Sequence, residues 1–276
     1  MMEQIRISDV TMKQTGKDFT LSFKEKIEIP KLLDKLGVSV IEIEPIVQPK
    51  IDALRIKSVA STVRNSIVAV PVQLSQESVD ATWNALKEAK HPRLQVCASI
   101  STVQMEYLFK KKPEAMLKAI EEAILACCKK TADVEFVAED ATRSDTSFLY
   151  KAIRTAIAAG AKTVTVCDAT GAILPGELGV FLDAIYENVP ELKGVTLGLS
   201  CLNELAMADA CAIAAIRHGV REIKAAAYPI NQISLSNVAR LIAAKGDLWG
   251  VNCPVRTVEM NRIVKQVAWM CETRRS

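Results

Sequence analysis

The chain has 276 residues, of which 50% are hydrophobic and only 5% aromatic, so it can build a large core from Val, Ile, Leu and Ala. Its 35 basic and 32 acidic residues are spread along the chain, which excludes the basic block that nucleic acid or an anionic membrane would require. No apolar run approaches the roughly 20 residues of a membrane span, and we expect a cytoplasmic protein with no nucleic-acid or membrane partner.

The elements predicted in chain order alternate between short β-rich runs and longer amphipathic stretches, a pattern typical of βα units around a parallel sheet. The eight predicted strands are 5–11, 38–44, 66–72, 94–100, 134–141, 163–169, 195–201 and 222–228. Predicted helices between them include 24–35, 77–88, 113–129, 147–159, 177–187, 204–218 and 236–244. Gly37, Gly160 and Gly219 each close a helix just before a strand, where glycine supplies the left-handed C-cap.

These alternating elements predict an α/β fold, a (β/α)8 TIM barrel, because barrels of this kind routinely reach the length of this chain as one domain. We expect residues 1–276 to form that single domain, with residues 255–274 as a final helix packed on the barrel. Eight cysteines form no Cys-x-x-Cys pair and fit neither a zinc knuckle nor a disulfide framework, so most are expected to be small buried side chains in a reducing compartment.

Polar residues at the predicted carboxyl ends of strands are the first candidates for chemistry, because reactive groups of such barrels lie at that end. Several segments there resemble one family. Residues 134–145, Val-Glu-Phe-Val-Ala-Glu-Asp-Ala-Thr-Arg-Ser-Asp, are similar nearly residue for residue to the fifth-strand segment of isopropylmalate and homocitrate synthases. Weaker matches are 25–29, 33–42, 105–107, the turn 168–171 with Pro175, and 199–205. The chain thus resembles the family that contains 2-isopropylmalate synthase, homocitrate synthase and the hydroxymethylglutaryl-CoA lyases.

The resemblance implies carbon–carbon bond chemistry next to a thioester, with a divalent cation that polarises a keto-acid carbonyl. The family holds this metal with an Asp after the first strand and two His on the seventh. The matching positions here are Gln14, Ser200 and Leu202, so we expect no metal and no other resident cofactor. The family's arginine, which stabilises the enolate oxygen, is Lys13 here, and the loop 228–237 lacks the lyases' catalytic cysteine.

Candidate site residues follow from strand-end position and from the resemblance. The candidate catalytic residues are Lys13, Glu42 and Glu139, with Glu42 where the family places an acid/base glutamate. The candidate substrate-binding residues are Asp9, Glu44, Thr142, Arg143, Asp168 and Asn203. We expect the charged members to converge in one pocket at the barrel mouth. The alternative is that they neutralise one another as ion pairs without catalysis.

Three functions remain open from the sequence. One is a non-catalytic or regulatory relative of a synthase that retains a keto-acid (2-oxo acid) or acyl-CoA pocket. A second is a metal-independent enzyme of acyl-transfer (Claisen-type) or aldol chemistry, with Lys13 polarising the carbonyl, Glu42 or Glu139 as base and acetyl-CoA as co-substrate. The third is a barrel of unrelated function. In the first two cases the ligand is a small 2-oxo acid or an acyl-CoA, and the partner is a second copy (a homodimer) or a related synthase.

Overall fold

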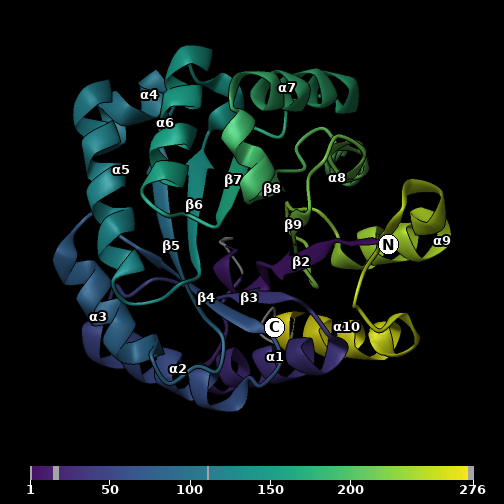
Figure 1. The fold of residues 1–276 in the computed structure, drawn as a ribbon. Helices are drawn as coiled ribbons and strands as arrows, with labels where there is room; N and C mark the ends of the chain where they lie inside the picture. The colour runs from purple at the N-terminus through teal and green to yellow at the C-terminus, as the bar shows by residue number, and fades with distance from the viewer. Residues whose placement is uncertain (1, 15–18, 111, 273–276) are drawn as a thin grey trace.

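The computed structural model describes residues 2–14, 19–110 and 112–272. Eight parallel strands close into a barrel in chain order, as Figure 1 shows. They are β2 (Arg6–Asp9), β3 (Val40–Glu42), β4 (Ile67–Val72), β5 (Pro92–Ser99), β6 (Val134–Glu139), β7 (Thr163–Asp168), β8 (Thr196–Cys201) and β9 (Glu222–Ala225). Closure is made by β2, which pairs with β3 on one side and with β9 on the other. The predicted (β/α)8 TIM barrel is therefore confirmed.

Helices form the outer layer around the strands (Figure 1). They are α1 (Phe23–Leu36), α2 (Pro49–Thr62), α3 (Gln76–Leu86), α4 (Thr102–Gln104), α5 (Pro113–Cys128), α6 (Thr146–Ala158), α7 (Pro175–Asn188), α8 (Ala208–Arg217), α9 (Leu235–Trp249) and α10 (Thr257–Glu272). Short turns η1 (Thr11–Lys13), η2 (Met105–Phe109), η3 (Ala141–Arg143) and η4 (Pro190–Gly194) lie between them. None of the helices in the described residues is both long and apolar enough to span a membrane.

Local sequence signals set the ends of α1. Ser22 accepts a hydrogen bond from the backbone of Glu25, and the Glu25 side chain accepts one from the backbone of Ser22, which forms a capping box. At the other end Gly37 adopts φ of 85° and donates to the last carbonyls of the helix. The helix therefore ends at Leu36, before β3 begins at Val40.

One strand pair was not predicted. β1 (Glu3–Gln4) pairs in parallel with β10 (Val251–Asn252) outside the barrel and joins the start of the chain to the segment after α9. Two-residue strands carry no detectable alternation, so sequence periodicity could not reveal them. The final helix was predicted over 255–274, and α10 spans Thr257–Glu272 and packs against α1 and α9.

The apolar core lies mainly between the barrel wall and the helices, where strand residues such as Ile7, Ile41 and Ile223 are fully buried. Successive residues of a strand point to opposite faces, so the intervening residues Ser8, Glu42 and Lys224 face the barrel interior. The interior is therefore unusually polar for a barrel, whose centre is normally filled by branched apolar side chains. All eight cysteines are free, and each is buried or partly buried.

Candidate active site at the barrel mouth

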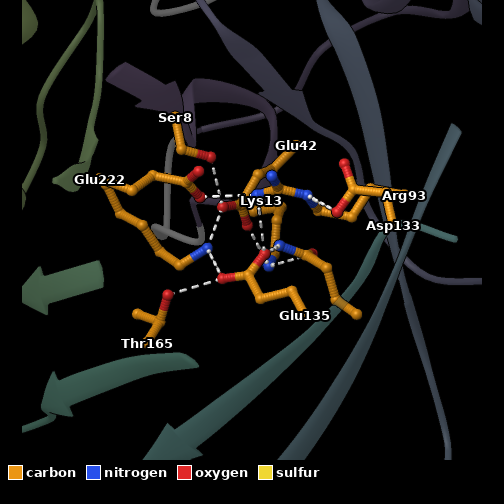
Figure 2. A network of polar contacts seen from close by, with 10 residues as sticks. Ser8, Lys13, Glu42, Arg93, Asp133, Glu135, Thr165 and Glu222 are labelled. Atoms are coloured by element: carbon orange, nitrogen blue, oxygen red, sulfur yellow. Dashed lines mark hydrogen bonds and ion pairs between the residues drawn. The ribbon is translucent and has the colours of Figure 1, made fainter. Parts of the chain in front are cut away.

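A network of charged and polar side chains fills the middle of the barrel, as Figure 2 shows. We call it the interior network; it consists of Ser8, Lys13, Glu42, Arg93, Gln95, Asp133, Glu135, Thr165, Glu222 and Lys224. Most of these side chains are fully buried. Because a buried charge without a partner is very costly, the network can persist only if its charges are paired.

Glu42 is the centre of the upper part of the network. One carboxylate oxygen accepts from Lys13 Nζ at 2.8 Å, and the other accepts from Ser8 Oγ at 2.7 Å and forms an ion pair with Lys224. Burial by itself would raise the pKa of Glu42, but Lys13 and Lys224 outweigh it and hold that pKa well below its ordinary value. Glu42 is therefore an anion that neutralises two lysines.

Glu135 and Glu222 complete the pairing in the lower part. Glu135 lies 2.7 Å from Lys224 Nζ and accepts hydrogen bonds from Gln95 and Thr165 at 2.8 and 2.7 Å. Arg93 binds Glu222 at 2.7 Å and is 3.5 Å from Glu135. The Nη2 atom of Arg93 and the Oε2 atom of Glu222 have no hydrogen-bond partner among the described residues. This part of the network is thus paired but not fully satisfied.

A cavity of about 170 Å³ opens directly above the network, at the carboxyl ends of the strands. Its wall is formed by Val10, Lys13, Gln14, Glu42, Cys97, Val137, Glu139, Cys167, Ser200, Lys224 and Gln232. The Lys13 side chain is 25% exposed, so its ammonium group is accessible from the cavity while it remains paired with Glu42. All three candidate catalytic residues therefore face one cavity.

Glu139 differs from Glu42, the other acid of the cavity wall, because its side chain makes no hydrogen bond or ion pair with another described residue. Burial raises the pKa of Glu139, an effect that Lys13 opposes and Asp140 reinforces. Burial likewise raises the pKa of the Cys97 thiol to about 12, so that thiol stays protonated at neutral pH. The cavity thus combines a lysine ammonium group with a carboxyl group that holds its proton more tightly than an ordinary glutamate.

Asp9 and Glu44 are held away from the cavity by other partners. Asp9 is buried and accepts hydrogen bonds from Thr11 and from the backbone of Ala227 at 2.8 Å, while burial raises its pKa to about 7. Glu44 lies just beyond β3 and pairs with Lys26 at 2.6 Å and with Arg55. Neither residue forms part of the cavity wall, and their roles in substrate binding stay predictions.

The other predicted substrate-binding residues, at or just beyond the ends of β6, β7 and β8, also form hydrogen bonds with neighbouring residues. Arg143 forms a two-pronged contact with Asp140, at 2.7 Å from each nitrogen. Asp168 accepts from Thr142 at 3.2 Å and from the turn that follows β7, which lowers its pKa despite burial. Asn203 accepts from the first residue of α8 at 3.0 Å. The expected convergence of the charged residues is met by Lys13, Glu42 and Glu139, whereas Asp168 and Arg143 lie outside the cavity wall.

Sequence reasoning missed Lys224, Gln95 and Gln232. Lys224 lines the cavity and is 4% exposed at its side chain, and Gln95 accepts from Lys13 at 3.4 Å. The available signal was a lysine at an alternate position from Glu222 within a β-run, which places both side chains on one face of the strand. Gln232 gave no comparable signal, because it lies in an irregular loop.

The three positions at which the resemblance places metal ligands do not fit a divalent cation. The Gln14 amide donates to the carbonyl of Tyr228 at 2.7 Å and accepts from Ile230 at 2.8 Å, so its polar atoms are already used. Leu202 has no donor atom, and Ser200 offers only a neutral hydroxyl. Among residues 2–14, 19–110 and 112–272, no three His, Cys, Asp or Glu side chains are grouped so as to hold a metal ion.

Comparison with known proteins agrees with the fold and with the segments that carry the resemblance. A 2-isopropylmalate synthase from Carboxydothermus hydrogenoformans is 32% identical over 274 residues, which cover 97% of this chain and 54% of the relative. Another from Pyrococcus furiosus is 33% identical over 275 residues, 97% of this chain and 55% of the relative. The chain thus spans about half the length of the curated relatives it matches.

Solved structures with the same fold include an HMG-CoA lyase from Brucella melitensis, with a TM-score of 0.81, 14% identity and coverage of 98% of this chain and 99% of that one. An HMG-CoA lyase from Acinetobacter baumannii, solved in complex with coenzyme A and 3-methylmalate, has a TM-score of 0.78, 13% identity and coverage of 97% and 91%. The HMGL-like family model matches residues 4–230. With most of its length covered by that match, the chain belongs to the HMGL-like family.

Proposed function

We propose that the protein binds a small 2-oxo acid in the cavity at the barrel mouth without a divalent metal, as a relative that lacks metal-dependent synthase activity. The observation that carries the proposal is the placement of Lys13 and Glu139 in the wall of one small cavity whose surroundings do not fit a metal. The 2-isopropylmalate synthases to which the chain is similar make the family's substrates the natural candidates.

Lys13 supplies the cation that a carboxylate ligand needs. It is partly exposed to the cavity and stays protonated, because Glu42 raises its pKa against the effect of burial. An ammonium group binds a carboxylate through charge-assisted hydrogen bonds, which are stronger than those between neutral groups. The volume of about 170 Å³ suits an acid of a few carbon atoms.

Glu139 supplies the second contact. Its side chain lies in the cavity wall, and its raised pKa favours the protonated form, which donates a hydrogen bond to a keto or carboxylate oxygen. Lys13 and Glu139 together would fix both ends of a 2-oxo acid. Neither contact needs a metal ion, so neither depends on ligands at the positions of Gln14, Ser200 and Leu202.

Because the Glu139 carboxyl group has no partner among the described residues, a second function is also favoured, a metal-independent enzyme of the same chemical class. In that case deprotonated Glu139 would remove a proton from the carbon next to the thioester carbonyl of acetyl-CoA, and Lys13 would stabilise the enolate oxygen. The enolate carbon would then form a bond to the keto carbon of the 2-oxo acid. The resulting alkoxide would need a proton, which the glutamic acid formed in the first step can return. Hydrolysis of the thioester of this product by water would then give the free acid and release coenzyme A.

The test is a calorimetric titration with pyruvate, 2-oxoisovalerate and 2-oxoglutarate in the presence of EDTA. We expect saturable binding of at least one acid and a loss of about tenfold or more in affinity for Lys13→Ala, because one charge-assisted contact is removed. Lys26→Ala is the matched control, since Lys26 pairs with Glu44 away from the cavity wall. Binding that is equal in wild type and Lys13→Ala would contradict the proposal.

A second measurement separates the two functions. Release of free coenzyme A from acetyl-CoA with a bound 2-oxo acid, measured in EDTA, would support the metal-independent enzyme, and its absence would support the non-catalytic relative. Activity that appears only on addition of zinc, manganese or magnesium would contradict both.

A further inference from the structure

A second and larger cavity, of about 500 Å³, opens at the opposite end of the barrel, where the strands begin. Its wall is formed by Arg6, Ala132, Asp133, Lys162, Thr163, Lys193, Gly194, Val195 and Thr196. These residues start or directly precede β2, β6, β7 and β8. We call this hollow the lower cavity; it shares no wall residue with the cavity at the mouth.

Three cations surround the lower cavity. Arg6, Lys162 and Lys193 make no hydrogen bond or ion pair with any other described side chain. The one carboxylate in the wall, Asp133, is bound by Arg93 at 2.9 Å, as Figure 2 shows. Like charges around a shared hollow repel one another, and an anion bound there would be attracted by all three.

The wall of the lower cavity also offers a hydroxyl group. Thr163 lies in the wall, and its hydroxyl makes no hydrogen bond with a described residue. That hydroxyl can therefore hydrogen-bond to an oxygen atom of a ligand in the cavity. Arg6 alternates along β2 with Ser8, which binds Glu42 inside the barrel, so Arg6 lies on the interior side at the strand's beginning.

We infer that the lower cavity is a binding site for a small phosphorylated molecule, with the phosphate held by Arg6, Lys162, Lys193 and the Thr163 hydroxyl. A guanidinium group matches two phosphate oxygens, and ammonium groups add charge without a fixed direction. None of the wall residues is aromatic, so the wall offers no ring on which a nucleotide base could stack. The ligand is therefore a phosphorylated metabolite rather than one recognised through a base.

The lower cavity and the mouth can be occupied together, because the interior network separates them. Asp133 belongs to that network through Arg93, whereas Lys13 stands at its other end. A phosphate ligand should consequently bind whether or not the mouth has lost Lys13, which keeps the two proposals experimentally distinct.

The experiment uses the full chain and titrates inorganic phosphate, pyrophosphate and citrate at constant ionic strength, followed by calorimetry. We expect saturable phosphate binding that is weakened about tenfold or more in the Lys162→Gln/Lys193→Gln double variant, whose substitutions are at exposed positions. Thr163→Val, which replaces the hydroxyl by a methyl group of similar size, should weaken binding by a smaller factor. Lys50→Gln is the matched control, because Lys50 lies in the first turn of α2, at the other end of the barrel. Lys13→Ala should leave phosphate affinity unchanged.

Absence of saturable binding by phosphate and pyrophosphate would overturn the inference, and so would equal affinities in wild type and the double variant. Tighter binding of citrate than of either phosphate would overturn the assignment to phosphate. A loss of phosphate binding on Lys13→Ala would show that the ligand binds at the mouth instead.

Discussion

Glu42→Gln is the substitution that most directly tests the interior network. Glutamine keeps the shape of the side chain but turns one oxygen into an N–H donor. That donor must face either Lys13, now 2.8 Å from one oxygen, or Lys224, which is paired with the other. One ammonium group then meets a donor in place of an acceptor, and the cost is larger beside Lys224, whose side chain is 4% exposed, than beside Lys13, which faces the cavity.

The size of the effect follows from what each lysine retains. Removing one partner of a buried ion pair costs about 3–5 kcal/mol, and we expect a value near 3 because Lys224 keeps Glu135 at 2.7 Å and Lys13 keeps Gln95 at 3.4 Å. For a chain of this size the melting temperature should fall by roughly 6–10 °C. The matched control is Glu28→Gln, which breaks an exposed pair with Lys31 and should change the free energy of unfolding by less than about 1 kcal/mol.

Urea unfolding at several pH values is the assay. The pKa of Glu42 is lowered in the folded protein, so its contribution is present above the ordinary value of 4.5 and is lost as the pH falls towards the folded pKa. The difference between wild type and Glu42→Gln should consequently be largest near neutral pH and shrink below pH 4.5. Lys224→Met added to Glu42→Gln should cost less than the sum of the two single changes. A variant as stable as wild type at pH 7 would refute the account of the network.

Three further outcomes are expected. The stability of Asp9→Asn relative to wild type should be lowest near pH 4 and highest at and above pH 7. The pKa of Asp9 is raised to about 7 in the folded protein, so wild type loses stability as the pH rises from about 4 to 7. Urea unfolding at pH 4 and pH 8 gives the sign of the difference. Gln14→Ala should remove the hydrogen bond from Ile230 and destabilise the loop after β9 by about 0.5–1.5 kcal/mol, seen as faster hydrogen exchange of that backbone amide, and unchanged exchange would contradict this. Gly198→Ala should cost about 1–3 kcal/mol in thermal unfolding, because the added methyl group would overlap the Thr165 hydroxyl; a neutral result would mean that the barrel interior can expand there.

The acidic residues at the strand ends show how much of the site the local sequence pattern predicts. Alternation along β3 and β6 predicts where Glu42 and Glu139 lie, because a strand's period of two assigns each side chain to one face. It also predicts that they approach each other, since parallel strands end at one rim of the barrel. The same reasoning placed Arg143 at that rim but could not foresee its two-pronged contact with Asp140, because a strand-end position does not choose among nearby partners.

The sequence by itself determined the barrel, since repeated βα periodicity and the glycine caps that end helices are local features that can be recognised without knowing the tertiary contacts. Only the tertiary structure decided the chemistry of the interior. Lys224 pairs with a glutamate 182 positions away, and the Gln14 amide binds a backbone amide 216 positions away. Such pairings depend on barrel closure between β2 and β9, which brings the first and last strands side by side. Whether a charged side chain at a strand end is free to bind a ligand or is neutralised by another residue is therefore settled by closure of the barrel, after local structure has formed.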